Sequence, residues 1–377
     1  MEWLLNIIHY VVPFIILLGI LVFVHEFGHF IIARITGVKV TDFAVGFGKE
    51  LWGFKDKHGT NWKICAIPLG GYCQFLGDAD AASATNDTET INKLSEEDKK
   101  QAFPYQNAWK KMAIVLGGPG FNYLFAILIF TVMFSVLGKL IFPPIVGEVI
   151  ENGAAHKAGI IADDRVLEVN GQKVENFSDI TNEILLTVGG AADIKLQRGD
   201  EIIDINIVLE DVELDENGKM VKRPMLGIKS QSSVEVNHNK LSVTSAFVEA
   251  CNETWRITIG TLRGVGQMIT GQRGAQDLGG ILRIAEMSGD ISKKSSWIDF
   301  VVFMALLSIN LGLINLFPIP VLDGGHVVLY TIEIITGKEV NEKVKENLFK
   351  FGLGLIIALM LFATWNDIVH LFNRWFS

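Results

Sequence analysis

His25 and His29 stand four residues apart in the sequence HEFGH, with Glu26 beside the first of them. Residues i and i+4 lie on the same face of an α-helix, so both imidazoles can reach one metal ion. Glu26 is placed where it could take a proton from a water molecule on that metal. These residue types at this spacing therefore predict a metal-dependent hydrolytic site.

The motif stands at the end of a strongly apolar stretch. No Asp, Glu, Lys or Arg occurs between Trp3 and Val24, and ~20 apolar residues suffice for a helix to cross a bilayer. Ionisable groups at membrane depth cost roughly 2.5–3.5 kcal/mol each on insertion scales. Three of them within five positions therefore indicate a function. The alternative interpretation is a soluble helix that matches the motif by chance.

A third metal ligand is expected from the sequence LDGGH at residues 322–326. Catalytic zinc usually takes three protein ligands and leaves one position for water. Asp323 is favoured, because two prolines upstream break the helix and two glycines directly after it allow close approach of the chain. For Asp323 the alternative is a helix cap, and His326 fits better as a structural histidine than as the ligand.

Composition narrows the class of protein. The chain has 377 residues, of which 49% are hydrophobic and 20% charged, which fits membrane spans combined with water-facing domains. A net charge of -9 without a long basic run argues against nucleic-acid binding. The three cysteines form no CxxC pair, so neither a disulfide framework nor a cysteine zinc site is indicated.

Four stretches predict membrane helices, at about 4–32, 112–137, 300–335 and 351–372, the third interrupted by polar residues and prolines. Lysines and arginines crowd the loops after the first and the third stretch, so both loops are expected in the cytoplasm. The long region between the second and third stretches then faces the other side. Under this topology the histidine pair and Asp323 lie at matching depths, toward the cytoplasmic end of their spans.

The second membrane stretch begins with the sequence GGPGFN at residues 117–122. Small residues there permit close packing of helices. Asn122 could form a hydrogen bond within the bundle. A structural role for this segment is favoured over a catalytic one.

The first cytoplasmic loop contains an apolar segment, Trp62–Leu76, with Pro68-Leu69-Gly70-Gly71 at its centre. This pattern predicts a β-hairpin. Such a hairpin could dip into the membrane only where protein or a water cavity satisfies its backbone. The alternative is a β-ribbon on the surface.

The outer region holds a small β-rich domain. From residue 145 to 209, short β-like runs alternate with turn residues and one helix near 179–187. Residues 241–271 then predict a helix that is too polar to span. Lying on the outer membrane surface is favoured for that helix, and packing on the β domain is the alternative.

These segments together resemble the site-2 protease family of intramembrane zinc metalloproteases, in the bacterial branch typified by the regulator of sigma-E protease. HEFGH, GGPGFN and NLFPIPVLDGGH (315–326) match its three membrane motifs in order. VGFGKELW (45–52) and CAIPLGGY (65–72) match its cytoplasmic segments, and 145–209 resembles a PDZ domain of that branch. Members of the branch often carry two tandem PDZ domains, whereas this chain has sequence for one.

The resemblance implies a multi-pass α-helical membrane protein with about four transmembrane helices, a membrane-associated β-hairpin and an inserted PDZ-like domain. The expected parts are an N-terminal membrane part at 1–138, the PDZ-like domain at 143–210, an extracytoplasmic connector with an amphipathic helix at 211–298, and a C-terminal membrane part at 299–377.

The resemblance also implies roles for individual residues. Zinc would be bound by His25, His29 and Asp323, with Glu26 as the catalytic base. Substrate would be positioned by Asn315 and Pro318 and by the strand edge at Gly70 and Gly71. The amides of Ile145, Val146 and Gly147 would form a carboxylate-binding loop of the PDZ-like domain; the alternative is a domain that only obstructs bulky substrates.

The function expected from this resemblance is zinc-dependent intramembrane cleavage of single-pass membrane proteins, of the anti-sigma factor or remnant signal peptide type. The enzyme would lie among the lipids of the bacterial inner membrane, with its active site toward the cytoplasm and the PDZ-like domain outside. Two alternatives are a metal or proton transporter, which needs a polar path across the bilayer, and a non-catalytic PDZ-bearing scaffold, which has no need of Glu26.

Overall fold

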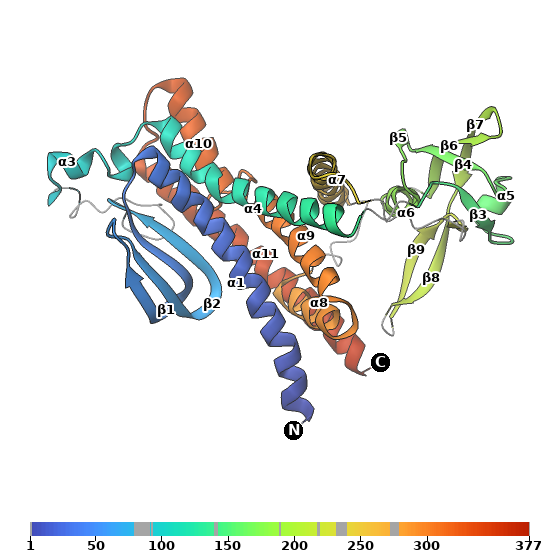
Figure 1. The fold of residues 1–377 in the computed structure, drawn as a ribbon, viewed down its shortest axis with the longest axis horizontal. Helices are drawn as coiled ribbons and strands as arrows, with labels where there is room; N and C mark the ends of the chain where they lie inside the picture. Colours follow the sequence, from blue (N-terminus) through green and yellow to red (C-terminus); the bar gives the residue numbers. More distant parts are fainter. Residues whose placement is uncertain are drawn as a thin grey trace. The chain divides into compact units, whose positions relative to one another are not determined.

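The computed structural model (Figure 1) describes residues 2–78, 91, 93–138, 142–187, 190–216, 219–230, 240–271 and 279–376. The chain divides into two compact units. Unit 1 consists of Met1–Thr131, Phe247–Thr258 and Gly279–Asp367, and unit 2 consists of Val132–Ala246, Ile259–Leu278 and Ile368–Ser377.

Four helices in the described part of the chain are long and apolar enough to cross a membrane: α1 (Glu2–Thr36), α4 (Ala108–Val136), α9 (Trp297–Asn315) and α11 (Glu342–Phe376). The prediction of four membrane helices is confirmed. The interrupted third stretch is resolved into α9, a turn, and a separate helix α10 (Asp323–Thr336). The two prolines in that turn explain the break, because proline cannot continue a helix.

Helices α1 and α4 meet backbone to backbone at Gly28 and Gly117. A Cβ atom on Gly28 would lie 2.2 Å from the carbonyl oxygen of Gly117, and one on Gly117 would lie 2.6 Å from that of Gly28. Small residues at a crossing let helix backbones approach this closely. The packing role expected for the GGPGFN segment is therefore observed, and the crossing holds the histidine motif against α4.

Helix α9 also packs on α4. The Ser308 hydroxyl donates a hydrogen bond of 2.9 Å to the backbone carbonyl of Asn122. A Cβ atom on Gly312 would lie 3.1 Å from the carbonyl oxygen of Pro119. Helix α4 therefore contacts both the helix that carries the histidine pair and the helix that leads to Asp323.

The segment between α1 and α4 forms a sheet of two long strands, β1 (Val40–Lys55) and β2 (Asn61–Phe75). The first part of β1, Val40 to Val45, pairs both with the end of β2, from Gly71 to Phe75, and with its beginning, around Asn61 to Ile64. The later part of β1 pairs again with the beginning of β2. Gly46 and Gly48 take positive φ values of 92° and 84°, which allows the bend in β1 between these parts.

This pairing corrects the predicted hairpin centred on Pro68–Gly71. The stretches on either side of that centre pair with β1, and the chain reverses between the two strands at residues 56–60. The apolar pattern of Trp62–Leu76 correctly indicated strand structure. It carried no information about the partner, because β1 is a separate segment upstream.

Unit 2 contains a β-rich fold made of β3 (Val146–Val149), α5 (Ala154–Lys157), β4 (Arg165–Val169), β5 (Gln172–Lys173), α6 (Phe177–Leu185), β6 (Ala191–Arg198), β7 (Glu201–Val208), β8 (Glu210–Glu216), β9 (Lys219–Met225) and β10 (Ile228–Ser230). One sheet has the strand order β5-β4-β6-β7, while β10 pairs with β3 and β8 with β9. The predicted alternation of short strands with one helix is present. Its core is built mainly from buried Val, Ile, Leu and Ala side chains.

The fold of unit 2 continues past residue 210, where the sequence analysis placed the end of this domain. β10 pairs with β3, and Leu226, 4% exposed, belongs to the same core. The amide of Ala155 donates to the carbonyl of Leu226 at 2.8 Å. Leu226 and β10 (Ile228–Ser230) are therefore part of the same packed body.

The remaining helices are α3 (Glu96–Lys99) and η1 (Phe103–Tyr105) before α4, and α7 (Val243–Ile269) and α8 (Ile281–Lys294) in the predicted connector. Residues 217–218, 231–239 and 272–278 of that connector lie outside the described residues. The helix predicted at 241–271 corresponds to α7. Asp367 of α11 accepts hydrogen bonds from the amides of Gly280, Leu282 and Arg283, and so caps the start of α8.

Candidate metal centre

The structure brings His25, His29 and Asp323 together. Both histidines project from the same face of α1, and Asp323 is the first residue of α10. Nε2 of His25 lies 3.2 Å from Oδ2 of Asp323, and Nε2 of His29 lies 3.6 Å from Oδ1. The two Nε2 atoms are 3.3 Å apart. Three ligand atoms of the kinds that zinc prefers therefore surround one point.

The spacing of these ligand atoms suits a single small ion. With bonds of about 2.0–2.1 Å to nitrogen and oxygen, neighbouring ligand atoms around zinc lie about 3.3–3.4 Å apart. The 3.3 Å between the two Nε2 atoms and the 3.2 Å from Nε2 of His25 to Oδ2 of Asp323 are close to that value. The 3.6 Å from Nε2 of His29 is measured to the other carboxylate oxygen, Oδ1. Oδ2 of Asp323 is buried, and apart from Nε2 of His25 at 3.2 Å it has no hydrogen-bond partner among the described residues. A buried carboxylate oxygen left in this way needs a cation.

The three candidate ligands line a cavity of about 280 Å³. Its wall comes from α1, the β1–β2 sheet, α4, and the turn between α9 and α10: His25, Glu26, His29, Phe47, Gly71, Cys73, Phe75, Val115, Asn315, Val321, Leu322, Asp323 and His326. The cavity leaves room beside the ligands for water and for a segment of substrate.

Helix α4 orients both imidazoles. Nδ1 of His29 donates to the backbone carbonyl of Ile114 at 2.9 Å, which leaves its Nε2 unprotonated and directed at Asp323. On the neighbouring ring, Nδ1 of His25 lies 3.1 Å from the side-chain amide nitrogen of Asn122. Residues of one helix thus contact the outer nitrogens of both candidate ligands.

The turn before α10 aims Asp323 at the histidines. Cβ atoms on Gly324 and Gly325 would lie 2.3 and 2.5 Å from carbonyl oxygens of the turn, so only glycine fits at either position. This is the close approach for which the two glycines were singled out in the sequence. Val321 takes a φ of 91°, a conformation that strains a β-branched residue and is found mainly where function requires it.

Glu26 faces the same cavity as the candidate ligands. Cys73 of β2 lines the same cavity. A Cβ atom on Gly71 would lie 3.1 Å from Cγ of Glu26 and 2.7 Å from the carbonyl oxygen of Ala44. The end of β2 therefore passes directly over the proposed base, at a position that only glycine can occupy.

The other predicted substrate-positioning residues take different places. Asn315, the last residue of α9, lines the cavity. Gly70 has a φ of 104° and a Cβ atom there would meet the Phe47 ring at 2.6 Å, so it shapes the cavity wall through Phe47. Pro318 lies in the turn after α9 and is not among the residues that line the cavity in the described structure.

The predicted carboxylate-binding loop in unit 2 is corrected by its hydrogen bonds. The amide of Ile145 donates to the carbonyl of Pro143 at 2.7 Å, and the amide of Val146 donates to that of Asp164 at 2.9 Å. Val146 is also fully buried. Of the three expected donors, the amides of Ile145 and Val146 are therefore not free to bind a peptide carboxylate. The third expected donor is Gly147.

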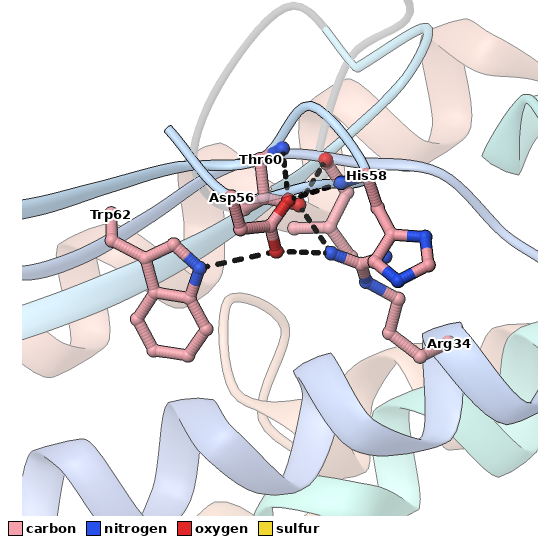
Figure 2. Close-up of polar contacts among 6 residues, drawn as sticks. Arg34, Asp56, His58, Thr60 and Trp62 are labelled. Carbon is pink, nitrogen blue, oxygen red and sulfur yellow. Dashed lines mark hydrogen bonds and ion pairs between the residues drawn. The ribbon is translucent and has the colours of Figure 1, made fainter. Parts of the chain in front are cut away.

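A cluster of hydrogen bonds around Asp56 connects the turn between β1 and β2 to α1 (Figure 2). Asp56 accepts hydrogen bonds from the amides of His58 and Thr60 at 2.8 and 3.0 Å and from the indole of Trp62 at 3.3 Å. The Arg34 guanidinium, at the end of α1, pairs with Asp56 and donates to the Thr60 hydroxyl. Burial alone would raise the pKa of Asp56, but these donors outweigh it and lower the pKa.

Sequence reasoning missed the part that α4 plays. The segment GGPGFN was interpreted as structural, yet Asn122 contacts His25 directly. Its signal was an amide inside an apolar run, four residues after Gly118 and three after Pro119. The Ile114 contact had no signal in the sequence, because a backbone carbonyl is common to every residue type.

Comparison with known proteins places the chain among metalloproteases. The model of peptidase family M50 matches residues 13–359. A protein of Agrobacterium fabrum named as a zinc metalloprotease is 41% identical over 96% of this chain and 96% of its own length. One of Rhizobium meliloti, also so named, is 37% identical over 99% and 100%. The metalloprotease MmpA of Caulobacter vibrioides is 31% identical over 95% and 94%.

Proposed function

The chain belongs to peptidase family M50, the site-2 protease family, and is a zinc metalloprotease, and we propose that it cleaves the transmembrane segments of single-pass membrane proteins within the bilayer. One observation carries this proposal. One cavity is lined by the three candidate ligands, His25, His29 and Asp323, and by Glu26. The two histidines and Glu26 belong to α1, a helix long and apolar enough to span a membrane.

His25, His29 and Asp323 are the residues proposed to hold zinc. Zinc bound there supplies Lewis-acid chemistry, acidifying water and stabilising negative charge on a carbonyl oxygen. Glu26 takes the proton from the attacking water and passes it to the nitrogen of the departing amine. Gly71 of β2 lies against Glu26, where a Cβ atom would be 3.1 Å from Cγ of the glutamate, so the end of β2 bounds the space in which the proton is exchanged.

Substrate binding is proposed to occur along the end of β2. A transmembrane helix hides its peptide bonds, so cleavage requires local unwinding, which exposes backbone groups at membrane depth. A strand edge satisfies such groups by β-addition. Gly71 and Cys73 both line the cavity and belong to the terminal part of β2. Asn315, which also lines the cavity, is proposed to position the same segment.

The exposed apolar side chains of the β1–β2 sheet suit a membrane-associated element. Leu51, Trp52, Phe54, Ile64 and Ile67 are between 49% and 66% exposed, which is unfavourable in water and acceptable against lipid or an apolar substrate. We place the sheet on the cytoplasmic side of a bacterial inner membrane, and the PDZ-like domain of unit 2 outside, on the basis of the loop charges. Substrates of the anti-sigma factor or remnant signal peptide type fit this arrangement.

The test is to purify the wild type, Glu26→Gln and the control Glu346→Gln in nanodiscs, then measure bound zinc and cleavage of a model single-pass substrate. Glu346 lies on α11 and pairs with Lys350 at the surface. Zinc in all three proteins, with cleavage by wild type and control alone, is the expected result. Cleavage by Glu26→Gln would overturn the role of the base, and absence of zinc from the wild type would overturn the site.

A further inference from the structure

Asn122 is a fully buried amide in the middle of α4, a membrane helix. Its Nδ2 lies 3.1 Å from Nδ1 of His25. Its Oδ1 is buried and has no hydrogen-bond partner among the described residues. A buried amide with one end on an imidazole and the other end unpaired is costly at this depth, so the arrangement calls for an explanation.

The chemistry of the imidazole supplies one. Nε2 of His25 points at Asp323 and His29, and a nitrogen that binds a metal cannot carry a proton. The neutral ring then carries its proton on Nδ1 and needs an acceptor there. An amide NH2 group is a donor only, whereas the carbonyl oxygen at the other end of the same side chain is an acceptor.

A half-turn of the Asn122 amide supplies that acceptor. It places Oδ1, the atom without a partner, against Nδ1–H of His25. Only the side chain turns, and the backbone carbonyl of Asn122 keeps its hydrogen bond from Ser308 of α9. His29 has no comparable freedom, since its acceptor is the fixed backbone carbonyl of Ile114.

We propose that Asn122 is the positioning residue that selects the metal-binding tautomer of His25, by accepting a hydrogen bond from Nδ1–H through its Oδ1 atom. The inference rests on the proposed zinc site and extends it to α4. It assigns Asn122 no contact with substrate. Its effect is on the affinity for the metal and the geometry around it.

The experiment measures zinc affinity of the purified full-length protein by competition with a chromophoric chelator. Asn122→Leu has nearly the shape of asparagine and removes both polar groups. Loss of an orienting partner of a metal-bound histidine lowers affinity about 10- to 100-fold, and that is the expected result. Asn122→Asp keeps an acceptor at Nδ1 and is expected to bind zinc at least as tightly as the wild type.

Ser308→Ala is the matched control. It removes the hydroxyl that donates to the Asn122 backbone, within the same buried contact between α4 and α9, without touching the imidazole. Its zinc affinity is expected to stay close to that of the wild type. The visible absorption of the cobalt-substituted proteins gives a second readout, with a changed spectrum in Asn122→Leu and a wild-type-like spectrum in Asn122→Asp.

Two outcomes would overturn the inference: zinc affinity of Asn122→Leu equal to that of the wild type, or weaker binding by Asn122→Asp. Where the leucine variant fails to fold, judged by thermal unfolding of metal-free protein, the aspartate variant alone decides. A His25→Ala variant separates this from failure of the proposed site. If it binds zinc as the wild type does, the site itself is wrong.

Discussion

Gly118 of α4 lies against the imidazole of His29 so closely that a Cβ atom built on it would be 2.3 Å from Nε2. The same atom would lie 2.8 Å from Cε1 of His25. The space that the two rings occupy therefore exists because residue 118 has no side chain. This relationship links the GGPGFN segment to the proposed metal ligands through shape alone.

Gly118→Ala is expected to lower zinc affinity by about 100-fold or more, because the methyl group must displace both rings from their partners on α4. Gly120→Ala is the control, since a Cβ atom there meets no neighbour within 4 Å. That change is expected to leave zinc affinity intact and to stabilise the helix by about 0.5–1 kcal/mol. Chelator competition and thermal unfolding distinguish the two, and equal zinc affinities would contradict the steric argument.

Asp323→Asn is expected to reduce zinc affinity more than about 100-fold, beyond the loss that follows from removing an orienting partner. The carboxylate supplies an anionic oxygen facing each histidine, and an amide supplies one neutral oxygen. Asp299→Asn is the comparison, because Asp299 belongs to the capping box at the start of α9. It should weaken that cap while zinc stays bound. Full zinc occupancy in Asp323→Asn would exclude this residue as a ligand.

Asp56→Ala is expected to destabilise the protein by about 1–3 kcal/mol, because it leaves several buried or half-buried donors without an acceptor. Cleavage should fall while bound zinc is retained, since the β1–β2 sheet loses its attachment to α1. His58→Ala is a close control: only the backbone amide of His58 contacts Asp56, and this survives the change. Thermal unfolding and single-turnover cleavage report the two effects.

A double-mutant cycle with Arg34→Ala and Asp56→Ala measures how much of that loss belongs to the ion pair. A coupling of about 1 kcal/mol is expected for a partly exposed pair. A coupling of zero would mean that the other donors alone fix the turn.

The pH dependence of unit 2 is expected to follow Asp164. Burial alone would raise the pKa of this carboxyl, which is 1% exposed, but hydrogen bonds from Arg198 and from the Ile161 amide lower it below 3.8. A depressed pKa contributes stability above the unfolded value of about 3.9 and loses it as pH falls through the folded value. The protection of amides in β4 to β7 against hydrogen exchange, relative to the intrinsic exchange rate at each pH, should therefore fall below about pH 4.

Asp164→Asn is expected to flatten this acid dependence and to be less stable at neutral pH. Asp200→Asn, in the exposed turn between β6 and β7, should leave the profile as in the wild type. An unchanged profile in Asp164→Asn would show that other carboxylates govern the acid response.

Much of this protein could be predicted from local pattern. The four membrane helices follow from the length of apolar stretches, and the pairing of His25 with His29 follows from helical periodicity, because both depend only on neighbours along the chain. The glycines after Asp323 indicated close packing correctly, since glycine is needed wherever backbone approaches backbone. The strands of unit 2 and its helix near residues 179–187 could also be predicted, because they too follow from the local pattern of apolar and turn residues.

Other features depend on segments that are distant in the sequence. The partner of β2, the two amides of the Ile145–Gly147 loop that are already bonded, and the strand β10 that joins the domain after residue 210 are all set by long-range pairing. Residue type does not encode which strand or carbonyl another segment will meet.

The sequence by itself determined the chemistry on offer: two imidazoles on one helical face, a carboxylate beside them, and a second carboxylate released by a broken helix inside an apolar chain. Only the tertiary structure decided how these groups are held. The crossing of α1 and α4 at Gly28 and Gly117 brings the Ile114 carbonyl and the Asn122 amide onto the outer nitrogens of the rings. Those contacts arise from the angle and depth at which two helices pack, and that geometry is a property of the assembled bundle.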